Sequence, residues 1–143
     1  MKSKMRGKQS GFTLIEVMVV IVILGVLAAL VVPNVMGKVD SSKIKTTQIT
    51  LGKVANELKA FQMDNGRYPT AQDGGLDALV NQPANVKNFP SGGYLEKYPK
   101  DSWENDLQYI TPGADGRKFD LYSFGADGKE GGEGADADIY YQP

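Results

Sequence analysis

The sequence predicts an α+β fold in which a long N-terminal helix packs on a small antiparallel β-sheet. Three observations support this prediction. A long apolar run near the N-terminus is followed by an amphipathic pattern of helical period, and Pro and Gly divide the rest of the chain into short segments. The first two observations predict one helix, and the third predicts short strands joined by turns.

The apolar run extends over residues 12–36 and contains one charged residue, Glu16. A helix crossing the hydrocarbon core of a bilayer needs roughly 20 apolar residues, so this run is long enough to be a membrane anchor. The positive-inside rule keeps the basic N-terminal end cytoplasmic and places residues 37–143 across the membrane. Four cations form that basic end, without an acid among the first eleven residues: Lys2, Lys4, Arg6 and Lys8.

A cleaved secretory signal peptide is an alternative interpretation of this run. Ala28 and Ala29 lie late in it, as small residues do at such a cleavage site. The run is longer than the apolar core of a signal peptide, however, and the segment 33–36 that follows offers no clear processing site. The sequence therefore favours a retained helix.

The helical pattern continues beyond the anchor, with apolar residues on one face: Leu51, Val54, Ala55, Leu58 and Phe61. We expect this face to pack on the core of a domain. Asn65-Gly66 predicts the end of the helix, which would be about 80 Å long if it began at Phe12. Gly25 and Pro33 predict irregularity, with a kink or a locally melted stretch near Pro33 when copies of the helix pack together.

Short elements are expected in the remaining chain. Leu76–Val80 is predicted to form a short helix entered from Thr70 and Asp73, and the residues 111–116 a hairpin turn. The three strand candidates are Tyr94-Leu95, Leu107–Thr111 and Phe119–Phe124.

Composition excludes several functional classes. The chain has neither Cys nor His, so disulfides, thiolate metal sites and Ser-His-Asp or Cys-His catalysis are impossible. Residues 38–143 carry 12 Lys and Arg against 16 Asp and Glu, and this acidic balance does not fit a nucleic-acid-binding domain. A membrane-anchored enzyme using Asp136 and Asp138 is an alternative, but a glycine-rich loop lacks the rigid placement that acid–base catalysis needs. We expect a protein that is not an enzyme.

Glu16 is the residue that discriminates between kinds of anchor. A carboxylate within hydrocarbon costs a few kcal/mol and usually has a partner, yet no basic residue lies between Gln9 and Gly37. Either Glu16 is hydrated near the lipid headgroups, or its partner comes from another molecule.

The segment Gly11-Phe12-Thr13-Leu14-Ile15-Glu16 resembles the processing and methylation site of type IV pilins and pseudopilins. The resemblance implies a type IV pilin-like fold and cleavage by a prepilin peptidase between Gly11 and Phe12, which removes the leader 1–11. It also implies methylation of the new Phe12 amine. Glu16 of one subunit could then pair with the Phe12 ammonium of a neighbour, so that the charge sets register in an assembly.

The resemblance narrows to the major pseudopilin of the bacterial type II secretion system along most of the chain. Four segments carry it: residues 65–70, 92–94, 101–103 and 123–128. That group commonly has Pro after the Asp and Gly after the Trp, where this chain has Ser102 and Glu104. Trp103 and Tyr109 are interpreted as core or loop-packing residues.

An acidic, glycine-rich loop occupies residues 125–138. Oxygen ligands without His or Cys suit calcium, although a flexible, solvated loop explains the same composition and the EF-hand pattern fits poorly. The resemblance implies a Ca²⁺ site in the loop 124–138. Its expected ligands are carboxylates of Asp127, Asp136 and Asp138 and backbone carbonyls of Phe124 and Lys129.

The resemblance implies a structural subunit of a pseudopilus that grows from the inner membrane and drives export of folded proteins across the outer membrane. Its implied partners are further copies of the chain in a helical filament, minor pseudopilins, an inner-membrane assembly platform and a prepilin peptidase. The alternative is a type IV pilus subunit for adhesion or motility. Many such pilins close their C-terminal region with a disulfide, which this chain cannot form.

Overall fold

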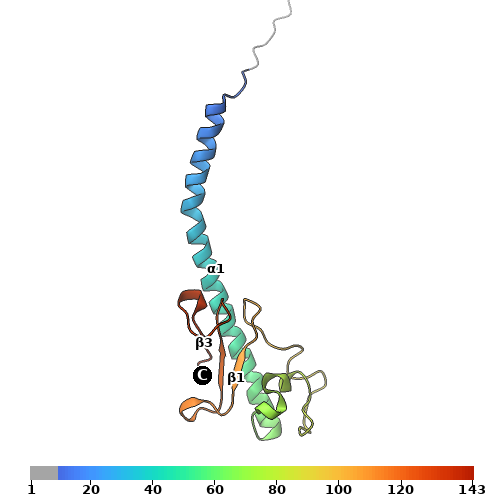
Figure 1. Ribbon diagram of the computed structural model, residues 1–143. Helices are drawn as coiled ribbons and strands as arrows, with labels where there is room; N and C mark the ends of the chain where they lie inside the picture. Colours follow the sequence, from blue (N-terminus) through green and yellow to red (C-terminus); the bar gives the residue numbers. More distant parts are fainter. Residues whose placement is uncertain (1–9) are drawn as a thin grey trace, which may run out of the picture. The chain divides into compact units, whose positions relative to one another are not determined.

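The structure is a computed structural model that describes residues 10–143, so residues 1–9 of the predicted leader lie outside the described part. It contains two compact units that meet after Lys38 and are described separately. Helix α1 runs from Leu14 to Asn65 (Figure 1). The expected irregularity at Gly25 and Pro33 does not interrupt α1, because a proline removes one helical hydrogen bond and the neighbouring bonds remain. A kink between packed copies stays a prediction.

The first unit consists of the apolar part of α1 and the residues before it. Its large apolar side chains from Phe12 to Met36 are exposed in the single chain. Within residues 10–143, α1 is the one helix long and apolar enough to cross a membrane, with an 18-residue window of mean hydropathy 3.1. Exposed apolar surface of this extent is expected to be covered by lipid or by other helices.

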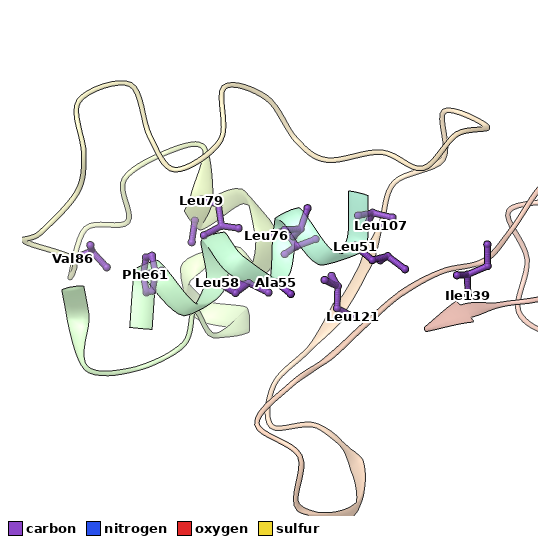
Figure 2. Packing of buried hydrophobic residues seen from close by; sticks show 12 residues of the cluster. Leu51, Ala55, Leu58, Phe61, Leu76, Leu79, Val86, Leu107, Leu121 and Ile139 are labelled. Atoms are coloured by element: carbon purple, nitrogen blue, oxygen red, sulfur yellow. The ribbon is translucent and has the colours of Figure 1, made fainter. Parts of the chain in front are cut away.

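The second unit, Val39–Pro143, has its own hydrophobic core. The predicted face of α1 is buried throughout, and Leu51, Leu58 and Phe61 are fully inaccessible to solvent. Figure 2 shows this face against residues from the rest of the unit: Leu76, Leu79, Val86, Leu107, Leu121 and Ile139. Burying a Leu or Phe side chain stabilises a fold by about 1.5–3 kcal/mol, so this contact fixes the part of α1 after Lys38 to the rest of its own unit.

The sheet has three antiparallel strands in the order β1-β2-β3. Strands β1 (Gln108–Ile110) and β2 (Asp120–Ser123) lie within the predicted segments and are joined by the predicted turn, which contains the 3₁₀ helix η3 (Ala114–Gly116). Strand β3 (Ile139–Tyr140) was not predicted, because two residues after a glycine-rich loop give no alternating pattern. The predicted α+β class is confirmed.

Two local expectations need correction. The predicted helix at residues 76–80 is the 3₁₀ helix η2 (Gly75–Leu79), which follows a second 3₁₀ turn, η1 (Ala71–Asp73). The strand predicted at Tyr94-Leu95 is wrong. Leu95 N–H donates one hydrogen bond of 2.9 Å to Leu79 O, but Leu79 belongs to η2 and not to a strand that could pair with this segment.

Candidate functional site

The predicted assembly residues surround the start of α1. Gly11 and Phe12 precede the helix, and the Phe12 side chain is 89% exposed. Thr13 and Glu16 form a reciprocal pair across the first turn. Thr13 N–H donates to Glu16 Oε2, and Glu16 N–H donates to Thr13 Oγ1, each at 3.3 Å.

This pair is a capping box, in which each side chain accepts from the other residue's backbone N–H group. The T-x-x-E signature of a capping box is present in the sequence and indicates this pair independently of the charge of Glu16. Glu16 therefore has a local role in the single chain, besides the predicted pairing with the Phe12 ammonium of a neighbour. That pairing stays a prediction.

The acidic loop of residues 125–138 connects β2 to β3 and contains the 3₁₀ helix η4 (Gly134–Asp136). Its two ends meet, because Ala126 N–H donates to Ala135 O at 2.9 Å. A Cβ added to Gly125 would lie 2.7 Å from Ala137 O and 2.8 Å from Ala135 O. Only glycine allows so close an approach, so Gly125 fixes the curl that brings backbone carbonyls together.

The predicted calcium ligands lie on this curl, but their carboxylates do not converge on a common point. Asp127 Oδ1 accepts from Lys129 N–H at 3.1 Å, and both Asp138 oxygens accept from Gly131 N–H at 3.1 and 3.2 Å. Asp136 is exposed within η4. Among residues 10–143, no group of three or more acidic side chains is close enough to hold a metal ion.

The oxygen donors of the loop fit calcium, although its three Asp carboxylates do not converge on one point. Calcium accepts backbone carbonyls as well as carboxylates, and needs six to eight oxygens in all. The loop supplies oxygen donors of both kinds, with the carbonyls of Ala135 and Ala137 turned toward Gly125. The carbonyls of Phe124 and Lys129 stay predicted ligands.

A buried hydrogen-bond network, which sequence reasoning missed, holds the base of the acidic loop. Asp101 is 5% exposed, and its Oδ2 accepts from Ser123 Oγ at 2.6 Å. Ser123 Oγ in turn accepts from Gly125 N–H at 3.0 Å, and Asn105 Nδ2 donates to Gly125 O at 3.1 Å. The network joins residues up to 24 positions apart, and no periodic pattern in the sequence indicates it.

Ser102 connects the same turn to α1. Its N–H donates to Thr47 Oγ1 at 3.2 Å, and its Oγ lies 2.9 Å from Thr47 Oγ1 and donates to Lys43 O at 2.9 Å. A proline at position 102 could donate none of these bonds, because it lacks both a backbone N–H and a hydroxyl group. Ser102 therefore ties this turn to α1 through hydrogen bonds.

Glu104 adopts a left-handed conformation, with φ of 64°. We expect Glu104→Gly to stabilise the Val39–Pro143 unit by ~0.5–1 kcal/mol, since this conformation costs a non-glycine residue roughly 1–2 kcal/mol and glycine's greater freedom in the unfolded chain cancels part of the gain. Urea unfolding measures the change. Glu104→Ala is the matched control, because it removes the same side chain but keeps Cβ. Equal stability of the Gly and Ala variants would contradict the argument from backbone conformation.

Comparisons with known proteins identify relatives over most of the chain. A family model described as "Type II secretion system (T2SS), protein G" matches residues 34–142, and one described as "Prokaryotic N-terminal methylation motif" matches residues 6–32. Among curated proteins, the type II secretion system core protein G of Pseudomonas aeruginosa is 53% identical over 137 residues, covering 94% of this chain and 95% of that protein. The protein of the same name from Vibrio cholerae is 52% identical over 141 residues, covering 95% and 92%.

A solved structure supports the same assignment. The crystal structure of the major pseudopilin from the type 2 secretion system of enterohaemorrhagic Escherichia coli matches with a TM-score of 0.62 and 33% sequence identity. The match covers 76% of this chain and 93% of that one. One family model matches most of the chain. The same chain carries the methylation motif, the long helix and the three-stranded sheet. The chain belongs to the family of the type II secretion system protein G.

Proposed function

We propose that this chain is the major structural subunit of a type II secretion pseudopilus. In this role it polymerises from the inner membrane and drives export of folded proteins across the outer membrane. The observation that carries the proposal is the match to the Pseudomonas aeruginosa core protein G along 95% of that protein. The type IV pilus alternative is not favoured, because the family model that matches residues 34–142 is that of protein G.

The proposed topology is a single pass through the inner membrane, with the N-terminus cytoplasmic and the domain of residues 37–143 periplasmic. Prepilin peptidase cuts after Gly11, and the Phe12 amine is then methylated. The match to the methylation motif over residues 6–32 supports this processing. The cut removes all four cations of the leader and leaves an ammonium group four residues before Glu16.

The proposed assembly is a helical filament of many copies, with minor pseudopilins and the inner-membrane assembly platform as further partners. The exposed apolar part of α1 supports this view, because neighbouring helices would bury the surface that the single chain exposes. The proposed role of the chain is that of a structural subunit.

We also propose that Ca²⁺ binds the loop 124–138, held by Asp127 with Asp136, Asp138 and the carbonyls of Phe124 and Lys129. The oxygen-only donors and the tight curl at Gly125 support this site. Bound calcium would tie the loop to β2 and β3 and so stabilise the domain by mass action.

Overproduction of the chain together with its secretion system tests the filament role. We expect sheared cell-surface material to contain filaments of this chain, with a mature N-terminus at Phe12 carrying one methyl group, as read by mass spectrometry. Abundant chain in the membrane without filaments would overturn the proposed function. An unprocessed N-terminus within intact filaments would overturn the processing alone.

A further inference from the structure

Two surfaces of opposite charge lie at opposite ends of the sheet. The hairpin loop between β1 and β2 precedes β2, and the acidic loop of residues 125–138 follows it. Loops before and after one strand lie at its two ends. Figure 1 shows the hairpin loop in orange and the acidic loop in dark red at the two ends of the sheet.

A pocket of about 690 Å³ opens beside the hairpin loop. Four aromatic residues line it, and among them the Phe119 ring centroid lies 5.1 Å from that of Tyr68 and 6.1 Å from that of Tyr141. The side chains lining it carry three cations, Lys59, Arg117 and Lys118, and one acid, Asp120. We call this site the basic pocket.

Two of the cations in the basic pocket are available to a partner. Arg117 Nε lies 2.7 Å from Asp120 Oδ1, which lowers the pKa of the Asp120 carboxyl, and Arg117 is also 3.9 Å from Asp115. Lys59 Nζ donates to the Tyr141 hydroxyl at 3.2 Å, a neutral partner. Within residues 10–143, neither Lys59 nor Lys118 forms an ion pair.

The acidic loop carries the complementary charge, with five acids and one lysine in residues 125–138. Glu130 and Glu133 are both exposed, and neither belongs to the proposed calcium ligands. In the described part of the chain, neither side chain forms an ion pair or a hydrogen bond to another side chain. These two carboxylates remain available even if calcium occupies the rest of the loop.

We propose that the acidic loop of one copy docks, through Glu130 and Glu133, at the basic pocket of the next copy. The contact joins two different surfaces of the chain, so it is head-to-tail and can repeat without closing, as an open filament requires. We assign a second copy of the chain as the occupant. The acidic loop that carries the complementary charge is part of this same chain, and it lies at the end of the sheet opposite the basic pocket. The inference rests on the proposed filament function. Repetition along the filament would multiply the effect of a contact that is weak when exposed.

Cysteine cross-linking in the full chain, produced with its own secretion system, tests this contact. The natural chain has no Cys, so any disulfide between two copies of it joins introduced residues. Co-production of a Lys118→Cys copy with a Glu130→Cys copy is expected to give a disulfide-linked dimer that is absent when either copy is produced alone. The matched control pairs Glu130→Cys with Lys87→Cys, an exposed lysine outside the basic pocket.

Charge reversal gives an independent readout. Lys118→Glu and Glu130→Lys are each expected to reduce sheared filament several-fold at unchanged chain level in the membrane, and the double variant should restore it. If filaments form normally but Lys118→Cys and Glu130→Cys cross-link no more than the Lys87→Cys control pair does, the proposed contact is wrong and the proposed filament function stands. A cross-link from Lys118→Cys to a different protein would overturn the second copy as occupant. Failure of the natural chain to form filaments would overturn the proposed function first, and the contact with it.

Discussion

Glu16→Gln is expected to stop filament assembly even though it leaves the start of α1 intact. The Gln side chain can still accept the Thr13 N–H that Glu16 Oε2 accepts at 3.3 Å, so the capping box survives. It cannot form an ion pair with the Phe12 ammonium of a neighbour. We expect filament yield to fall by about tenfold or more, since a loss of ~1.4 kcal/mol per contact changes an association constant by that factor.

Glu16→Leu separates the two roles further. It removes both the cap and the charge, and it should still insert, because an apolar side chain lowers the cost of entering hydrocarbon. Comparison of sheared filament with membrane-bound chain measures assembly apart from insertion. Glu57→Gln, the same substitution on the same helix, is the control and should assemble normally. If Glu16→Gln assembled normally and Glu16→Leu did not, Glu16 would act as a helix cap and not as an intermolecular partner.

Calcium is expected to raise the melting temperature of the Val39–Pro143 unit by roughly 10–20 °C when its concentration is near 100 times the dissociation constant. At that ratio binding adds about 2.7 kcal/mol, and each 1 kcal/mol shifts the melting temperature of a domain of about 100 residues by about 4–8 °C. Asp127→Ala should abolish the shift, because it removes the carboxylate that begins the acidic loop. Differential scanning calorimetry with calcium or chelator measures it.

Asp106→Ala is the matched control for calcium binding. Asp106 is an exposed acid that lies outside the acidic loop and forms a 3.8 Å ion pair with Lys100. This variant should keep the full response to calcium. Equal melting temperatures of the natural unit with calcium and with chelator would favour the alternative, a solvated loop without a metal.

The elements that could be predicted from the sequence are those with a repeating pattern. Each residue of the buried face of α1 could be predicted. The helical period of 3.6 residues places Leu51, Leu58 and Phe61 on one face, and this depends on the local sequence alone. Strand β2 alternates between half-buried and buried residues and was likewise found. Tyr94-Leu95 was mistaken for a strand because an apolar pair does not show whether a partner strand exists.

The hydrogen-bond network at the base of the acidic loop could not be predicted, because it depends on contacts between residues that are distant in the sequence. Asp101, Ser123 and Gly125 meet only after the sheet has formed. The sequence marked Asp101 through a resemblance but gave no reason for its burial. The carboxylates of the acidic loop were identified by residue type alone, and residue type does not determine whether three of them converge on one ion.

Deletion of the gene, with separate assays of exoprotein release and twitching motility, tests the central claim most directly. As a major pseudopilus subunit, the chain should be required for release of secreted proteins, with full recovery when the natural gene is restored and no recovery with Glu16→Gln. Twitching should be unchanged. Normal exoprotein release with loss of twitching would contradict the account and assign the chain to a surface pilus.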